Sequence, residues 1–250
     1  MKIRAMFALS VLVLGCTATA QAMPYPYLSG SFGGGTLEMG EVNEVLESQQ
    51  AAIRAGGYTD ITMKKVGAGS EWGFGGGLWL FPALRIGATW SQQHSFLSNR
   101  YHSPDHTYFY GEELTFDMAE TGVEAAVRVP QLFGFTFGGS MSRAKADFKL
   151  SDGEQTSYSY FGNDAKASKT GRTYAAFAGF EQTNGAGWTG ALHMGYRWRN
   201  MGTMAIHGLS NDGVNSAEWS GTTPEIDYTG LFVQCQIGYD LFRPHTKFGE

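Results

Sequence analysis

Several histidines stand close to serine and acidic residues, which are the side chains that nucleophilic catalysis uses. A hydrolase of that kind needs a hydroxyl activated by a histidine, which an acidic side chain holds in place. None of the candidates reproduces a catalytic motif residue by residue, so we expect no enzyme and assign no catalytic residue. The candidates are His94, Ser95, His102, Ser103, Asp105, His106, Glu112, Glu113, His207 and Asp212.

Metal and cofactor chemistry have weaker support. His102, Asp105 and His106 could place two ligands on one turn, but solvated loop residues are the ordinary explanation of such a spacing. The glycine-rich stretches GSFGGG and GFGGG are not followed by the GK[ST] of a phosphate-binding loop. We therefore expect neither a metal site nor a cofactor.

A different set of charged residues recurs within segments where apolar and polar residues alternate. Alternation marks a β-strand, because successive side chains point to opposite faces. The charges fall on the face opposite the bulky apolar residues, and buried charges persist only when they are paired. We predict an interior salt-bridge network, with its pairing left open. Its members are Glu71, Arg85, Glu120, Glu124, Arg128, Glu181, His193, Arg197, Arg199 and Asp240.

The alternation predicts eight strands joined by three short turns and four long loops. The short turns are expected at Pro82–Ala83, Pro130–Leu132 and Asn184–Gly187, and a helix over Glu41–Ala55 within the first long loop. The phase of alternation shifts near Met118–Ala119, which predicts a bulge, and again near Arg143. The predicted strands are Tyr25–Gly35, Ser70–Phe81, Leu84–Gln93, Glu113–Val129, Phe133–Leu150, Thr170–Gln182, Trp188–Asn200 and Ile226–Phe242.

The apolar face of these strands is too bulky for the inside of a small ring. An eight-stranded barrel has an interior only just wide enough for side chains. Tryptophan, tyrosine and leucine therefore fit better outside, with glycine and paired charges inside, as in a barrel that faces lipid. Aromatic residues gather near both expected rims, as in membrane barrels; they are Phe81, Phe133, Trp188, Tyr239 and Phe242 at one end, and Trp90, Tyr110 and Trp198 at the other. A soluble β-sandwich or lipocalin-like barrel, with the faces reversed, is the alternative.

The N-terminus predicts export. Lys2 and Arg4 precede a short apolar run, and Ala20-Gln21-Ala22 has the small-x-small pattern of a cleavage site. We expect a signal peptide over 1–22, a β-barrel over 23–242 and a short tail over 243–250. A lipoprotein remains an alternative, because Val13-Leu14-Gly15-Cys16 loosely resembles a lipobox.

Composition supports the same class and excludes others. Glycine accounts for 35 of 250 residues, aromatics for 14% and charged residues for only 16%, below the quarter usual in soluble domains. Without Lys2 and Arg4 the chain keeps 16 basic and 23 acidic residues, so clustered basic charge for a nucleic-acid partner is not expected. Loss of Cys16 with the leader would leave Cys235 alone, without an intramolecular disulfide.

The chain resembles the small bacterial outer-membrane barrels of the OmpA transmembrane-domain, OmpX and OmpW kind. The segments that carry this resemblance are LWLFPALRIGATW, GALHMGYRW and the closing strand GLFVQCQIGYDLF. The resemblance implies an all-β, eight-stranded antiparallel up-and-down transmembrane β-barrel in the cell outer membrane. It also implies recognition of the last strand by the outer-membrane insertase. The chain departs from the pattern because Arg243–Glu250 follow the terminal aromatic residue, Phe242.

A closed, charge-paired interior predicts a structural or surface-interaction role, in contact with outer-membrane lipids and lipopolysaccharide. A narrow porin-like channel for small solutes is the first alternative, and a barrel enzyme acting on lipid or peptide is the second. The 41–55 helix is expected to cap the mouth or to rest on the lipopolysaccharide surface.

Overall fold

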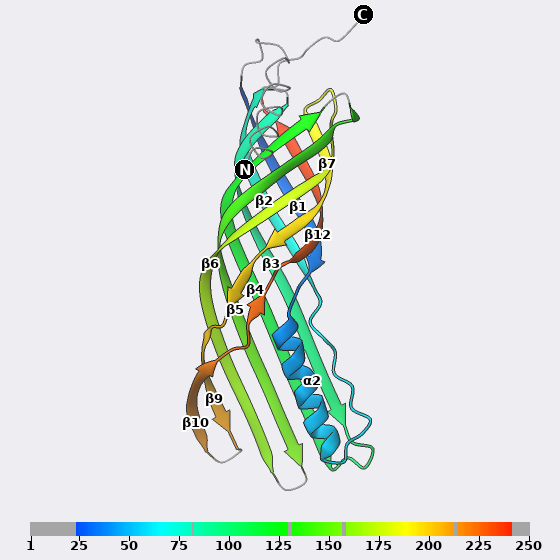
Figure 1. The fold of residues 1–250 in the computed structure, drawn as a ribbon, viewed down its shortest axis with the longest axis vertical. Helices are drawn as coiled ribbons and strands as arrows, with labels where there is room; N and C mark the ends of the chain where they lie inside the picture. Colours follow the sequence, from blue (N-terminus) through cyan, green and yellow to red (C-terminus); the bar gives the residue numbers. More distant parts are fainter. Residues whose placement is uncertain (1–23, 82, 130–131, 157–158, 213–214, 242–250) are drawn as a thin grey trace, which may run out of the picture.

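The computed structural model describes residues 24–81, 83–129, 132–156, 159–212 and 215–241. The expected signal peptide and the 243–250 tail lie outside these residues, as do Phe242 and parts of two predicted turns. The chain forms antiparallel β-structure with one helix (Figure 1). The elements are β1 Tyr25–Thr36, α2 Gly40–Ala55, β2 Ala68–Phe81, β3 Leu84–His102, β4 Tyr108–Val129, β5 Phe135–Thr156, β6 Tyr160–Thr183, β7 Trp188–Trp198, β8 Asn200–Gly202, β9 Ala205–Asn211, β10 Ser216–Thr222, β11 Ile226–Asp227 and β12 Gly230–Asp240.

Eight of the strands pair into a closed ring. Its order is β6-β5-β4-β3-β2-β1-β12-β7, and the pairing of β7 with β6 closes it. The ends of the described chain meet in this ring, where the Leu241 amide donates to the Pro26 carbonyl at 2.8 Å. Closure leaves no free edge in the ring, so its backbone groups hydrogen-bond to neighbouring strands.

Four strands continue far beyond the ring. In Figure 1, β3 to β6 run the length of the molecule, whereas β1, β7 and β12 are much shorter. The far part of β6 pairs with β9 instead of β7, and β10 pairs with β9. We call this part, made of the far halves of β3–β6 with β9, β10 and α2, the extension.

Three of the predicted long loops were therefore wrong over most of their length. In the first of these, His94–His102 lie in β3 and Tyr108–Gly111 lie in β4. In the second, Ser151–Thr156 lie in β5 and Tyr160–Lys169 lie in β6. The segment Met201–Glu225 contains the β9–β10 hairpin. The last strand of the ring, β12, begins at Gly230, later than predicted, because Ile226–Asp227 forms the separate strand β11. These polar segments form strands because their outward side chains face water.

The predicted bulge at Met118–Ala119 is also wrong. Both pairings of β4, with β3 and with β5, run through this point without a shift in register. Even-numbered residues face inward along the whole strand, from Tyr108 to Arg128. What changes at Met118 is the chemistry of the inner face, which is polar in the ring and apolar in the extension. The phase shift near Arg143 has the same cause on β5.

Helix α2 covers the inner face of the extension (Figure 1). The prediction of a helix over Glu41–Ala55 is confirmed within one residue. Val42 and Leu46 are buried in a core cluster with Phe116 and Phe148 from the strands. Asn43 ties the returning segment to the helix, since its side chain accepts from the Val66 amide and donates to the Val66 carbonyl, both at 2.9 Å. In the described part of the chain, no helix is both long and apolar enough to cross a bilayer.

One short turn is described in full. The predicted Asn184–Gly187 turn is confirmed, with the Gly187 amide donating to the Asn184 carbonyl at 3.1 Å. Gly187 has a φ of 88°, a left-handed conformation that glycine adopts without a steric penalty. This turn holds β6 and β7 together at the end of the ring opposite the extension.

Candidate functional site: the charged interior

The ring interior holds the charged residues that alternation places on the inner face. All ten predicted members of the network face inward, and all but Glu124 are buried. The ion pairs form two layers at different heights, described below as the turn-side layer and the extension-side layer.

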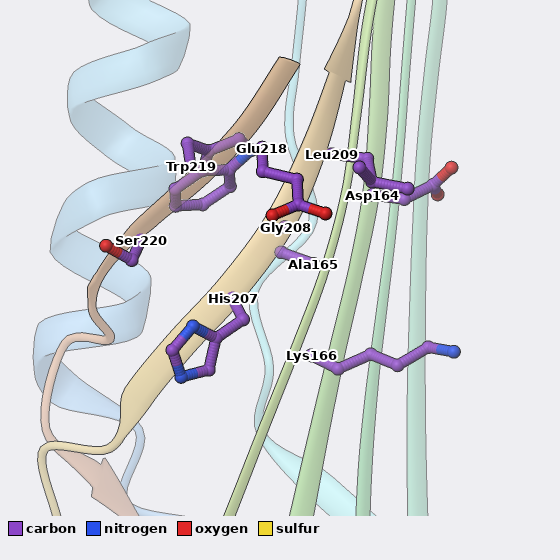
Figure 2. Close-up of a pocket in the computed structure, with 9 residues that line it drawn as sticks. All are labelled: Asp164, Ala165, Lys166, His207, Gly208, Leu209, Glu218, Trp219 and Ser220. Atoms are coloured by element: carbon purple, nitrogen blue, oxygen red, sulfur yellow. The ribbon is translucent and has the colours of Figure 1, made fainter. Parts of the chain in front are cut away.

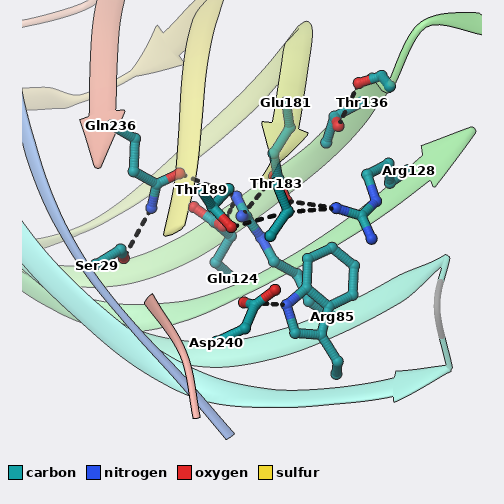
Figure 3. Close-up of polar contacts among 12 residues, drawn as sticks. Ser29, Arg85, Glu124, Arg128, Thr136, Glu181, Thr183, Thr189, Gln236 and Asp240 are labelled. Carbon is teal, nitrogen blue, oxygen red and sulfur yellow. Dashed lines mark hydrogen bonds and ion pairs between the residues drawn. The ribbon is translucent and has the colours of Figure 1, made fainter. Parts of the chain in front are cut away.

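The turn-side layer is centred on Glu181 (Figure 3). Arg85 Nη1 lies 2.7 Å from Glu181 Oε2, and Arg85 Nη2 lies 3.0 Å from Glu124 Oε1. Arg128 Nη1 lies 3.5 Å from Glu181 Oε1 and donates to Thr183 Oγ1 at 3.1 Å. Two arginines thus balance two glutamates at this level.

Aromatic rings surround this layer. The Trp79 indole donates through Nε1 to Asp240 Oδ1 at 3.1 Å. The Arg128 guanidinium lies 4.5 Å from the centre of a Trp79 ring, within the range of a cation–π contact. Tyr25 and Tyr27 also pack against Trp79.

The extension-side layer is centred on Glu71. Its carboxylate pairs with both Arg197 and Arg199. Arg199 also lies 2.7 Å from Glu120 Oε2 and donates to Gln93 Oε1 at 2.5 Å. Arg197 sits 3.8 Å above the centre of the Phe232 ring. Glutamates from β2 and β4 are thus tied to Arg197 of β7 and to Arg199, which directly follows β7.

His193 belongs to neither layer. Its side chain is 2% exposed, its Nε2 has no hydrogen-bond partner, and its ring lies 4.9 Å from that of Phe177. A small cavity of about 60 Å³ touches Glu71, Glu120 and Glu124 and therefore lies between the layers. It has room for only a few waters.

The extension has the opposite arrangement, with an apolar interior. Its buried residues include Phe116, Met118, Phe148, Ile206 and Tyr228. Tyr110, which we expected at the outer rim, instead points inward and is buried. The aromatic-rim prediction is therefore wrong for this residue, because β4 turns its even-numbered side chains toward the helix.

A pair of carboxyl groups interrupts this apolar interior. Glu112 and Asp152 are directly opposite each other on β4 and β5. Burial raises the pKa of the Glu112 carboxyl, against an opposing hydrogen bond from Asn99, and nearby Asp152 raises it further. Burial likewise raises the pKa of Asp152. The pair therefore holds protons to higher pH than exposed carboxyl groups do.

The residues considered for catalysis do not converge. His94 pairs with Asp117 at 2.7 Å on the outer face, while the neighbouring Ser95 faces inward and donates to the Ala68 carbonyl. Ser103 donates to Asp105 Oδ1 at 2.5 Å and accepts from the Tyr108 amide, so its hydroxyl shapes a turn. Hydrogen bonds from Ser103 and Thr107 lower the pKa of Asp105.

His102 and His106 line one open groove of about 400 Å³ together with Phe109 and Gln155, whereas His207 and Asp212 are apart. His207 lines an open groove of about 760 Å³ with Lys166 and Glu218, and Asp212 is not among the lining residues (Figure 2). Glu113 pairs with Arg100 at 2.8 Å on the exposed face. Among the described residues, no group of three histidine, cysteine, aspartate or glutamate side chains could hold a metal ion. Cys235 is a free, exposed thiol on the outer face of β12.

No family model matches the chain, and no curated protein matches it. Among solved structures it is similar to LpxR from Salmonella typhimurium, with 10% identity and a TM-score of 0.24 over 85% of this chain and 99% of that one. The translocator domain of the autotransporter NalP from Neisseria meningitidis gives 10% identity and 0.25 over 94% and 95%. A Salmonella typhi OmpF complex with daunomycin gives 8% and 0.12 over 87% and 97%. TM-scores this low carry no argument here.

Proposed function

We propose that the chain is an outer-membrane β-barrel protein whose eight-stranded ring crosses the bilayer with a closed interior. On this proposal the extension projects from the outer surface and carries a structural or surface-interaction role. The small barrels of the OmpA transmembrane-domain, OmpX and OmpW kind remain the relatives that we propose.

One observation carries the proposal: the ring is apolar on the outside. The outward positions of its described strands hold large hydrophobic side chains and no charged residue. Met194 is 62% exposed and Ile237 is 67% exposed, although a monomeric soluble protein rarely exposes a contiguous apolar surface of this extent. The exposed hydrophobic residues of the ring include Leu28, Phe32, Phe74, Ile86, Val123, Phe180, Leu192, Met194, Leu231, Val233 and Ile237.

The size of this surface fits a bilayer. β7 runs for 11 residues from Trp188 to Trp198, and a tilted membrane strand needs about 9–11. Both tryptophans point outward and are half-exposed, at the two levels where aromatic side chains favour the membrane interface. Contacts with outer-membrane lipids and lipopolysaccharide, and assembly by the outer-membrane insertase, follow from this proposal.

The interior favours closure over conduction and gives no support to catalysis. Ions crossing the ring would have to break both ion-pair layers and pass a cavity of only about 60 Å³. The histidines, serines and acidic residues considered above do not form a nucleophile with an oriented base. We therefore propose a barrel that is neither a channel nor an enzyme.

Three measurements test the proposal. Cell fractionation should recover the protein in the outer membrane, and the unheated protein should migrate differently from the heated protein on a gel. Planar bilayers containing the folded protein should show no conductance steps above background. Recovery in the periplasm would refute the membrane location, and resolved steps would refute closure.

A further inference from the structure

Two arginines face each other on the outer surface of the molecule. Arg143 on β5 is directly opposite Arg172 on β6. Both are exposed, and neither makes an ion pair or a hydrogen bond within the described residues. Like charges directly opposite on neighbouring strands repel each other, so this pairing lowers stability unless something else neutralises it.

The pair lies at the extension-side edge of the apolar outer surface of the ring, which we call the apolar belt. Met141 and Tyr174 are opposite each other two residues away on the same two strands, and both are exposed. Tyr174 is in turn opposite Trp198, the tryptophan at the extension end of β7. At about 3.3 Å per residue, the arginines lie roughly 7 Å beyond the last apolar row along the strands, which on the proposed membrane location is the level of the lipid headgroups.

The other like-charged pairs on this face have side chains of the opposite charge on the same strands or opposite them. Asp117 and Asp147 are directly opposite, but Asp117 pairs with His94 and Asp147 with Lys145 at 3.2 Å. Lys149 and Lys166 are also opposite, six residues farther along β5, and each has an aspartate two residues away on its own strand, Asp147 or Asp164. At the corresponding positions, two residues from Arg143 and Arg172 on the ring side, the arginine pair has the apolar Met141 and Tyr174.

We propose that Arg143 and Arg172 together bind a phosphate group on the headgroup of an outer-leaflet lipid, whose acyl chains lie against Met141 and Tyr174. Guanidinium groups bind phosphate through paired hydrogen bonds, and two of them match its charge. One lipid would thus satisfy the two exposed charges and the apolar row beside them. This inference rests on the proposed membrane location.

The test compares two charge-matched double variants. R143Q/R172Q removes the pair at the belt, and K149Q/K166Q removes two cations about 20 Å farther along the strands. Each protein is folded into phosphatidylcholine vesicles that contain either lipid A or its dephosphorylated form. The first measurement is the temperature at which the folded gel band converts to the unfolded band. The second identifies, by mass spectrometry, the lipid that co-purifies with each protein.

Lipid A should raise the conversion temperature of the wild type and of K149Q/K166Q, and dephosphorylated lipid should not. R143Q/R172Q should lose this rise and the co-purifying phosphorylated lipid. An equal rise in R143Q/R172Q would overturn the proposal, as would the same rise produced by inorganic phosphate in vesicles without lipid A. A wild type with no folded band in any vesicle would instead refute the membrane location itself.

Discussion

The ring and the extension share four strands and yet have opposite interiors. On β5 the inward residues of the ring are Thr136 and Ser142, while those of the extension are Ala144 and Phe148. The outward residues change at the same place, from Met141 to Arg143. The hydrogen-bonded ladder continues unchanged through this point, so the backbone does not cause the reversal.

On the proposed function, the reversal reflects two different surroundings that act on one sheet. A strand in water hides its apolar face inside, and the extension does this beneath α2. A strand in lipid exposes its apolar face and keeps polar groups inside, which is the arrangement of the ring. The level of Met141 and Arg143 therefore marks where, on the proposed function, the bilayer ends.

The largest expected effect concerns a buried charge in the ring. Glu181→Gln leaves Arg85 and Arg128 with one partner fewer in a buried site, which costs about 3–5 kcal/mol. Glu113→Gln removes an exposed pair with Arg100 in the extension and should cost less than about 1 kcal/mol. Urea unfolding of both variants in lipid vesicles measures the two losses. Equal losses would contradict the distinction between a buried ion pair inside the ring and an exposed ion pair on the outside of the extension.

A smaller effect is expected at the outer surface. Met194 lies near the middle of β7 and points outward, so Met194→Arg places a charge in the apolar belt and should cost about 2–4 kcal/mol. Ser168→Arg also introduces an arginine, on the exposed outer face of β6 in the extension, and should be nearly neutral. The folded fraction in vesicles across a urea series compares the two. A neutral Met194→Arg would place the ring surface in water.

The smallest effect is a pH dependence confined to the extension. Because burial raises the pKa of Glu112 and Asp152 in the folded protein, the folded state retains protons that the unfolded state releases. Their contribution to stability is complete below the ordinary carboxyl pKa and is lost as the pH rises through the folded value. Hydrogen exchange of the α2 amides should therefore accelerate with rising pH more than the intrinsic exchange rate of an unprotected amide does. Exchange of the ring amides should rise only as that intrinsic rate rises.

Glu112→Gln is the control for this pH dependence, because the amide keeps the shape and cannot ionise. The variant should show a weaker change in α2 protection across the same pH series, with Asp152 accounting for what remains. An undiminished change would assign the effect to groups outside the carboxyl pair.

Much of the ring was predictable from residue order. The pattern in β7 and β12, where Leu192, Met194 and Ile237 share the outer face with other bulky residues, predicted strand positions closely. The extension was not predictable in this way. Asp164 and Lys166, on its outer face, were interpreted as loop residues. The reversal at Met118 was interpreted as a bulge, because a single strand does not reveal what surrounds it.

The sequence by itself determined the local elements: alternation specified strands and their two faces, and the spacing of Val42, Val45, Leu46 and Ile53 specified an amphipathic helix. Only the tertiary structure decided which carboxylates meet which arginines, since Glu71 and Arg197 come from strands far apart in the chain. It also decided where the faces exchange roles, because that depends on α2 and the β9–β10 hairpin covering one end of the sheet. The physical reason is that side-chain spacing is a local property, whereas burial depends on every neighbour that folding brings together.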